Sequence, residues 1–112
     1  EIIELESGEK IKTIETCMQV LGALTDIEAD KKSLIVNLGG GVISDLGGFV
    51  ASTFKRGVDF INIPTTLLAM VDASVGAKTG VDFEGIKNHI GTIYEPRGVF
   101  INTVFLETLS TL

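Results

Sequence analysis

The most constraining stretch of the chain is residues 33–45, SLIVNLGGGVISD, in which an apolar run stops at three consecutive glycines. The run before the glycines is nearly continuous and rich in β-branched residues, which is typical of a parallel strand buried on both faces. Glycines permit positive φ and let backbone N–H groups come close to a ligand. A helix expected from about Val42 would turn its positive end towards the same place. The stretch therefore predicts a strand, a tight turn and a helix, with a place for an anion such as a pyrophosphate.

The turn does not carry the complete dinucleotide-binding fingerprint. That pattern has glycines at its first, third and sixth positions, and counting from Gly39 the sixth position is Ser44. The turn alone therefore leaves two interpretations open: a phosphate cradle, or a tight strand-to-helix turn that binds no ligand.

Composition limits the class of protein. With 112 residues, 45% of them hydrophobic, the chain is at most one globular α/β domain with a modest core. The net charge of −6 argues against nucleic acid or an anionic membrane as the main partner. No apolar stretch approaches the roughly 20 residues of a membrane helix, and the acidic start is not a signal peptide. We expect a cytoplasmic protein, with Cys17 in its core.

The first half of the chain predicts one strand and two helices around the opening stretch. Residues 1–6 alternate loosely and predict a strand that ends at a Ser-Gly turn. A helix is expected around residues 42–54, where small side chains would allow close packing on the sheet, namely Gly47, Gly48, Ala51 and Ser52. From about Glu9 the apolar spacing predicts another helix, whose inward stripe comprises Ile11, Ile14, Met18, Leu21 and Leu24.

The second half predicts further alternation. Residues 58–63 read as a strand ended by Pro64, and Thr65 and Thr66 stand at the start of a third helix through Val71. We interpret residues 72–91, DASVGAKTGVDFEGIKNHIG, as a polar loop that carries function. A strand over 99–101 follows, and Asn102 would cap a last helix over 103–112.

Strands that alternate with helices at this spacing predict right-handed βαβ units in a parallel sheet. Ligands bind such sheets at the carboxyl ends of the strands. We therefore expect residues 39–41 and 64–66 to lie on the same rim of the sheet.

Longer motifs narrow the interpretation. GGGVISD, KRGVDFINIPTTLLAMVDASVGAKTGVD and KNHIG, with GEKIK upstream and FLETL downstream, closely resemble the NAD-binding domain of the 3-dehydroquinate synthase family of sugar-phosphate cyclases. The resemblance runs from Gly8 over nearly the whole chain. It implies a Rossmann-like parallel sheet with flanking helices, with residues 1–112 as a partial NAD-binding domain that lacks the family's helical metal-binding domain.

The resemblance also implies an activity. Enzymes of this family are phosphorus-oxygen lyases of the shikimate pathway, and they use NAD with zinc or cobalt to convert 3-deoxy-arabino-heptulosonate 7-phosphate into 3-dehydroquinate and phosphate. Oxidation of the C5 alcohol acidifies the C6 hydrogen, phosphate leaves by β-elimination, and return of the hydride restores the alcohol. The metal would polarise the C5 oxygen.

Site residues are carried over from the same resemblance. It places Asp72, Lys78 and Asn88 against the substrate, where donors and a cation suit the phosphate and a carboxylate suits sugar hydroxyls. Arg56 would reach the substrate phosphate of a neighbouring subunit, which implies a homodimer. The NAD contacts would be Glu9 and Lys12 at the adenosine end, then Gly40, Gly41, Val42, Ile43, Ser44, Asp45, Thr65, Thr66, Lys78, Lys87, Phe105, Leu106, Glu107 and Thr108.

Each of these residues also has a plainer interpretation. A carboxylate in a first helical turn suits the helix dipole, and cations at a helix end are commonly solvated. On this basis Asp45 could be a dipole partner, Lys55 and Arg56 a solvated helix end, Asp72 a cap, Lys78 a surface charge and Asn88 a residue that fixes a loop. We interpret His89, the only histidine, as a loop residue.

The sequence also departs from a complete enzyme. A catalytic zinc needs about three protein ligands, yet the single His and single Cys lie in unrelated segments. We expect no metal site in this chain, with the family's ligands, a glutamate and two histidines, beyond Leu112, and the chain itself to be an inactive fragment. Smaller departures are Ser44 and Ala77, where the family often has glycine.

Two alternatives to the synthase remain. One is a sister cyclase that makes a 2-deoxy-scyllo-inosose or valiolone ring, although VGAKTGVD favours the dehydroquinate branch. The other is a catalytically inert NAD-binding module.

Overall fold

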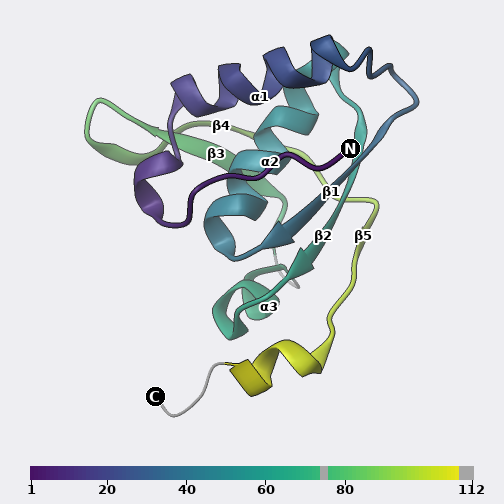
Figure 1. The fold of residues 1–112 in the computed structure, drawn as a ribbon. Coiled ribbons are helices and arrows are strands. Elements are labelled where there is room, and N and C mark those ends of the chain that lie inside the picture. The colour runs from purple at the N-terminus through teal and green to yellow at the C-terminus, as the bar shows by residue number, and fades with distance from the viewer. Residues whose placement is uncertain (74–75, 109–112) are drawn as a thin grey trace.

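A computed structural model of the chain describes residues 1–73 and 76–108, and it has the predicted α/β architecture. A parallel sheet has the strand order β1-β2-β5, and β3 pairs antiparallel with β4 in a separate two-stranded ribbon (Figure 1). The strands are β1 (Leu34–Gly39), β2 (Asp59–Pro64), β3 (Lys78–Phe83), β4 (Ile86–Ile93) and β5 (Gly98–Val99). The helices are α1 (Ile14–Asp26), α2 (Gly41–Thr53) and α3 (Leu67–Ala73), with 3₁₀ turns η1 (Glu9–Ile11), η2 (Phe54–Arg56) and η3 (Thr103–Thr108).

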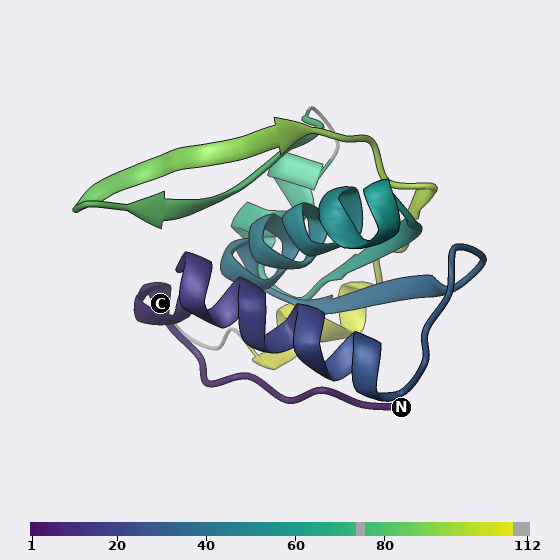
Figure 2. The ribbon, with the colours of Figure 1, turned by 90° about the horizontal axis from the view of Figure 1, so that it is seen from above.

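Helix α2 is the centre of the fold. It packs on the β1–β2 sheet on one side and on the ribbon on the other, with α1 alongside (Figure 2). Two adjacent glycines allow this double packing. A Cβ on Gly47 would lie 2.0 Å from Asn37 Oδ1 of β1, and one on Gly48 would lie 2.6 Å from Thr79 Cγ2 of β3. The prediction of close packing through small residues is thus confirmed, and each glycine serves a different layer.

The hydrophobic core lies around the same helix. Leu46 and Val50 of α2 and Phe60 of β2 are each 1% exposed. Burial of a side chain of this size contributes roughly 1.5–3 kcal/mol. Cys17 joins this core from α1, as predicted, and burial raises the pKa of its thiol.

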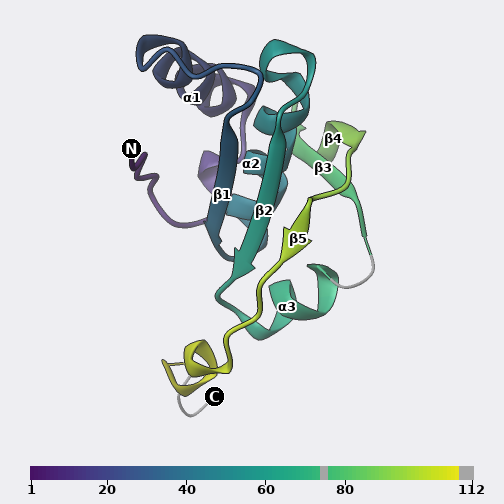
Figure 3. The same ribbon diagram turned by 90° about the vertical axis from the view of Figure 1, so that its right-hand side faces the viewer.

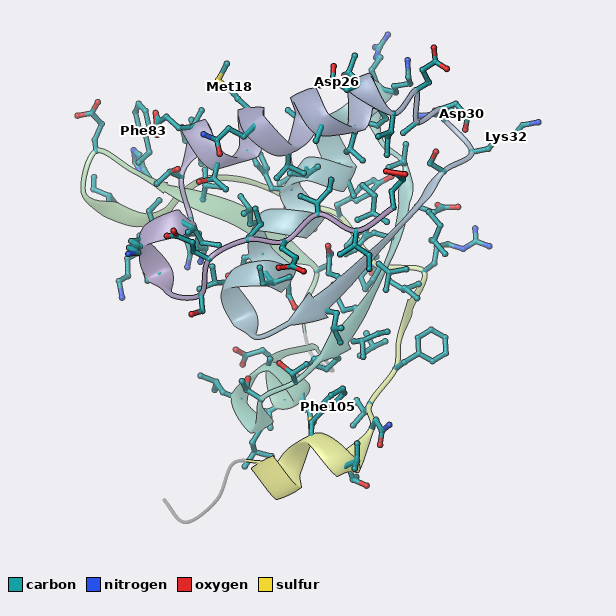
Figure 4. The ribbon with its side chains drawn as sticks, in the orientation of Figure 1. Met18, Asp26, Asp30, Lys32, Phe83 and Phe105 are labelled. Carbon is teal, nitrogen blue, oxygen red and sulfur yellow. The ribbon has the colours of Figure 1, made fainter. Side chains whose placement is uncertain are left out.

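The N-terminal elements differ from the prediction. Residues 1–6 form no strand, and the helix begins at Ile14 and not near Glu9. Thr13 sets this start, because its Oγ1 accepts a hydrogen bond from Thr16 N–H at 3.1 Å, as an N-cap does. Met18 was expected inside but is 64% exposed and points away from α1 (Figure 4). The buried face centres on Cys17 and Leu24, and at about 100° per residue Met18 falls to one side of it.

Strand β1 was predicted to be buried on both faces, and this is wrong for the described chain. The side chains of Leu34, Val36 and Leu38 are 50–59% exposed. Ile35 and Asn37 point the other way, towards α2. Helices α1 and α2 lie on the same face of the sheet, and no α-helix of residues 1–73 and 76–108 covers the opposite face (Figure 3).

Residues 72–91 were expected to be a loop, and most of them are the ribbon. Its tip is a two-residue turn with positive φ at Glu84 (54°) and Gly85 (75°), as in a type I′ hairpin. Gly80 pairs with Gly91 across the ribbon, and a Cβ on Gly91 would lie 1.9 Å from Thr79 O. These two glycines are strand residues at a place where the two backbones come close together. The interpretation of the segment as a loop, which its glycines suggested, was therefore wrong.

The remaining elements follow the prediction in part, since β5 covers Gly98–Val99 where a strand over residues 99–101 was expected. Thr66 caps α3, since its Oγ1 accepts from Ala69 N–H at 3.1 Å. Asn102 caps the last segment, with Oδ1 accepting from Val104 N–H at 3.1 Å, but that segment is the 3₁₀ turn η3 and not an α-helix. Its expected continuation over 109–112 lies outside the described residues.

Candidate functional site

The predicted rim exists at the carboxyl ends of β1 and β2. Thr65 N–H donates to Gly39 O at 3.0 Å, so the ends of the two strands are joined directly. Both strands run towards the same end of the molecule, and α3 and η3 lie beyond it (Figure 3). The residues after β1 and β2 are therefore neighbours, as expected for a parallel sheet.

The glycines of the turn provide space for neighbouring groups and do not adopt unusual backbone angles. Positive φ among the described glycines occurs at Gly8, Gly57 and Gly85, so residues 39–41 do not use the freedom that the sequence suggested. A Cβ on Gly39 would lie 2.7 Å from Ile43 Cγ1 of α2. A Cβ on Gly41 would meet no described atom within 4 Å. Gly39 therefore makes room for the helix, and Gly41 faces open space.

The start of α2 suits an anion. Gly40 is the N-cap and has no side chain with which to cap the helix, and Ser44 N–H makes the first bond of the turn to Gly40 O at 3.1 Å. The earlier N–H groups of a helix have no acceptor within the helix itself, and together they attract negative charge.

Two adjoining cavities lie at this position. The rim cavity, of about 520 Å³, lies between the start of α2, β2, α3 and the ribbon, and its lining includes Gly41, Ser44, Asp45, Asp72 and Lys78. The ribbon cavity, of about 380 Å³, is lined by Asp45, Lys78, Thr79, Asn88, His89, Gly91, Thr92 and Ile93. Both volumes are in the range of small-molecule sites. Asp45 and Lys78 line both cavities, so they stand at the boundary between them.

The ribbon is held onto α2 by a chain of hydroxyl groups. Thr79 Oγ1 and Thr92 Oγ1 lie 2.5 Å apart, Thr92 Oγ1 donates to Ser52 Oγ at 2.8 Å, and Ser52 Oγ donates to Phe49 O at 2.9 Å. Because Thr79 follows Lys78 in β3, this chain fixes the backbone from which Lys78 extends. Sequence reasoning treated Ser52 only as a small residue and did not identify the two threonines.

Lys12 is the buried cation of the site. The residue is 4% exposed, and its Nζ donates to Asp45 Oδ2 at 2.8 Å and also to Asn88 Oδ1. Glu9 Oε2 lies 3.9 Å from the same nitrogen. Lys12 and Glu9 were expected at the adenosine end of NAD, and the structure directs the ammonium of Lys12 at protein acceptors. Asp45 is therefore more than a dipole partner of its helix, because it forms an ion pair.

Glu9 and Asp82 form a carboxyl pair beside Lys12. A hydrogen bond with Asp82 is the main cause that raises the pKa of Glu9 above its ordinary value, and desolvation adds to it, while Lys12 and Lys87 act against it. The backbone N–H of Asn88, and then the hydrogen bond from Glu9, lower the pKa of Asp82. The two shifts have opposite signs, so of the two carboxyl groups Glu9 binds a proton more readily than Asp82.

Among the remaining expected NAD contacts, the structure brings some to the rim and leaves others away from it. Ile43 packs under Gly39, and Thr66 Cγ2 is the atom nearest to a Cβ on Gly40. Lys87 is exposed at the start of β4 in the ribbon. Phe105 is half-buried in η3, near α3 (Figure 4). The side chains of Leu106, Glu107 and Thr108 lie outside the described part of the chain.

Arg56 is not brought to the cavities. It follows the far end of α2, which extends roughly 20 Å from Gly41 at 1.5 Å per residue. The turn is unusual, since Lys55, Arg56 and Gly57 have φ of 48°, 68° and 119°. Lys31 Nζ supports it by donating to Gly57 O at 2.6 Å and to Lys55 O at 3.3 Å.

Two aromatic residues on the ribbon side differ from the prediction: Tyr94 was not predicted as a site residue, and His89 was expected in a loop. Tyr94 lines the rim cavity, stacks on Phe60 with ring centroids 5.7 Å apart, and donates to Val58 O at 3.1 Å. Its only sequence signal was that it is the single tyrosine. His89 was interpreted as a loop residue, but it lies in β4, lines the ribbon cavity and stacks on Phe83.

Among residues 1–73 and 76–108, no group of three or more His, Cys, Asp or Glu side chains is arranged so that it could hold a metal ion. The same residues include no helix with the length and apolar character needed to cross a bilayer.

Comparisons with known proteins agree on a relationship. The family model described as "3-dehydroquinate synthase N-terminal" matches residues 2–112. The 3-dehydroquinate synthase of Alkaliphilus oremlandii is 54% identical over 105 residues, which are 94% of this chain and 29% of the relative. The chain thus spans less than a third of the length of the curated relative it matches.

Two solved structures have a similar fold. A 2-deoxy-scyllo-inosose synthase complexed with carbaglucose-6-phosphate, NAD⁺ and Co²⁺ has a TM-score of 0.89 and 32% identity, over 94% of this chain and 29% of that one. The 2-epi-5-epi-valiolone synthase of Streptomyces hygroscopicus subsp. jinggangensis, with NAD⁺ and Zn²⁺ bound, has a TM-score of 0.87 and 36% identity, over 93% of this chain and 29% of that one.

Proposed function

Because the chain belongs to the 3-dehydroquinate synthase N-terminal family, we propose that it forms the NAD-binding part of an enzyme that converts 3-deoxy-arabino-heptulosonate 7-phosphate into 3-dehydroquinate and phosphate. The observation that carries this proposal is the position of Lys78, which lines the rim cavity together with Gly41 and the ribbon cavity together with Asn88. A cation at that boundary can contact a phosphorylated substrate that lies beside a bound cofactor.

The rim residues fit NAD. The open space at Gly41 is where a Cβ would otherwise project, and the uncapped start of α2 supplies N–H donors for a pyrophosphate. Asp45 lines the same cavity and can accept hydrogen bonds from a ribose. NAD bound there supplies a hydride acceptor that returns the hydride later in the same turnover.

The ribbon and α3 would hold the substrate. Lys78 and the Asn88 carboxamide can donate to phosphate oxygens, and Asp72 lines the rim cavity, where it can accept from sugar hydroxyls. Arg56 lies far from these groups, so in this proposal it serves the site of a second subunit, and the active enzyme is a homodimer. As a biosynthetic enzyme it would act in the cytoplasm.

The described residues do not fit a catalytic metal. They include no suitable cluster of ligands, while both solved cyclases are described with Co²⁺ or Zn²⁺. We assign no step of the reaction to a metal held by the described residues. In this proposal the ligands come from the part of a full-length enzyme that this chain does not span.

A sister cyclase is the second candidate. The inosose synthase and the valiolone synthase share the fold at TM-scores of 0.89 and 0.87. Identity to the 3-dehydroquinate synthase relative is nevertheless 54%, against 32% and 36% for the two cyclases. This difference supports the dehydroquinate branch.

The test is phosphate release by a full-length protein that contains this chain, with NAD and zinc, before and after chelation. We expect release from 3-deoxy-arabino-heptulosonate 7-phosphate that requires both NAD and metal. Lys78→Ala should reduce kcat/KM by about 100-fold or more, the loss expected when a charged contact to the reacting group is removed.

Lys10→Met is the matched control for the loss of a lysine. Lys10 pairs only loosely with Glu6, at 3.8 Å and with both side chains 78% exposed, so its loss should leave the rate unchanged. Release from a hexose or heptulose phosphate of the sister enzymes, and none from the heptulosonate, would support a sister cyclase. NAD binding without turnover of any of these substrates would indicate an inert module.

A further inference from the structure

A single buried lysine connects the residues of the two cavities. The Lys12 side chain is 5% exposed, whereas its acidic neighbours Asp45 and Glu9 are 36% and 45% exposed. A buried ammonium is strongly unfavourable unless acceptors surround it. The position of Lys12 is therefore tied to the positions of its acceptors.

Those acceptors come from different elements. Asp45 belongs to α2 and lines both cavities, whereas Asn88 belongs to β4 and lines the ribbon cavity. An ammonium has three N–H donors, and that of Lys12 faces Asp45 Oδ2, Asn88 Oδ1 and Glu9 Oε2. Within the described residues Lys12 itself lines neither cavity, so it can affect a ligand through these partners.

A closed ring of hydrogen bonds links Lys12 to the ribbon. Asp82 N–H donates to Lys12 O at 2.9 Å, Asn88 N–H donates to Asp82 Oδ1 at 2.9 Å, and Lys12 Nζ donates to Asn88 Oδ1. The ring holds Asn88 at a φ of 53°, a left-handed conformation that asparagine tolerates better than most residues. The position of Asn88 thus depends on Lys12 through both backbone and side chain.

We propose that Lys12 is a positioning residue that fixes Asn88, on the substrate side, relative to Asp45, on the cofactor side, so that binding in the two cavities is coupled through its ammonium. This rests on the proposed function, which assigns NAD to the rim cavity and the sugar phosphate to Lys78 and Asn88. Such coupling is reciprocal: what disturbs Asn88 must also alter NAD affinity.

The experiment is a double-mutant cycle in a full-length protein that contains this chain. Lys12→Met keeps the side-chain length and removes the charge, and Asn88→Ala removes the acceptor on the ribbon. The dissociation constant of NAD is measured by calorimetry, and kcat and KM by phosphate release. Lys12→Met should raise both the NAD dissociation constant and the substrate KM on the order of 10-fold, within the usual range of coupling between sites.

The decisive arm is the effect of Asn88→Ala on NAD. Although Asn88 does not line the rim cavity, its loss should weaken NAD binding about threefold or more. In the Lys12→Met background the same change should have no further effect on NAD. Lys10→Met, the exposed control lysine, should alter neither constant. Unchanged NAD affinity in Asn88→Ala, or effects of the two substitutions that multiply, would overturn the proposal and favour an independent role for Lys12.

Two further measurements keep the test decisive. If Lys12→Met does not fold, Asn88→Asp replaces it: an aspartate retains an oxygen for Lys12, so NAD affinity should be preserved where Asn88→Ala loses it. If the wild-type protein releases no phosphate, the proposed function fails, but the NAD arm of the cycle still tests Lys12. Amide hydrogen exchange over residues 86–93 should then be faster in Lys12→Met, and unchanged exchange would contradict the proposal.

Discussion

The two ends of α2 use glycine in opposite ways. At its start, Gly39, Gly40 and Gly41 have ordinary φ, although this turn is where left-handed angles were expected. Beyond its end, Lys55 and Arg56 have φ of 48° and 68°, angles at which glycine is the usual residue. At the start of α2 glycine is thus present where the backbone does not need it. Beyond its end Gly57 does use a positive φ, of 119°, but two long side chains stand before it in the left-handed region.

The residues at the two ends of α2 serve different purposes. At the start of α2 the reason is room, for Ile43 beside Gly39 and for a ligand beside Gly41. Beyond its end, each left-handed L-residue costs about 1–2 kcal/mol, and Lys31 supports the turn by binding its carbonyl groups. A strained backbone that carries an exposed arginine points to a use for that side chain, since strain of this kind is concentrated at functional sites.

The largest expected effect concerns room inside α2 itself. Gly47→Ala would place a Cβ 2.0 Å from Oδ1 of Asn37, a side chain that is held in place because its Nδ2 donates to Asn62 Oδ1 at 3.1 Å. We expect the free energy of unfolding to fall by about 3 kcal/mol, the upper part of the range for overpacking, as measured by urea denaturation. Gly22→Ala in α1 is the control: a Cβ there meets no described atom within 4 Å, so the change should stabilise by up to about 1 kcal/mol.

The second prediction tests whether the room at Gly41 is meant for a ligand. Gly41→Ala should leave the fold intact, because its Cβ would enter open space. NAD affinity of the full-length protein should fall on the order of 10-fold, because the methyl group occupies the place from which backbone N–H groups meet the anion. Gly22→Ala should leave NAD affinity unchanged. An unchanged affinity in Gly41→Ala would mean that this turn has the plainer role of a tight connection.

The third prediction separates backbone strain from side-chain function. Lys55→Gly and Arg56→Gly both relieve a left-handed residue, so each should raise the free energy of unfolding by up to about 1 kcal/mol. Only Arg56→Gly should raise the substrate KM in phosphate release, since Lys55 has no proposed contact with substrate. Equal activity of both variants would mean that Arg56 does not contact substrate and is only a solvated residue at the end of the helix.

The sequence predicted local events better than distant pairing. The strand, turn and helix around residues 33–53, the cap at Thr66 and the common rim followed from apolar runs, glycines and caps, which act over a few residues. The ribbon did not, because Gly80 and Gly91 make sense only once their strands are paired. The Glu84–Gly85 turn was the available signal. Burial of Lys12 depends on Asp45 and Asn88, 33 and 76 residues away, so it could not be read from spacing.

The smallest expected effect concerns proton binding beside Lys12, near the glycine end of α2. The pKa of Glu9 is raised above its ordinary value of 4.5, so its contribution to stability is complete below that pH and is lost as the pH rises through the raised value. The pKa of Asp82 is lowered from 3.8, so its contribution is present above that pH and is lost as the pH falls through the lowered value. The bond from Glu9 to Asp82 is therefore complete only between the two shifted pKa values.

This window can be measured by NMR titration of the Glu9 carboxyl carbon. In Asp82→Ala the largest cause of the shift is gone, and the attraction of Lys12 and Lys87 for the carboxylate remains, so the pKa of Glu9 should return towards 4.5. Glu6→Gln is the control, because it alters an exposed carboxylate that pairs with Lys10 and not with Glu9. A raised pKa that persists in Asp82→Ala would assign the shift to desolvation. The link between η1 and the ribbon would then depend on Lys12, and not on a proton shared between Glu9 and Asp82.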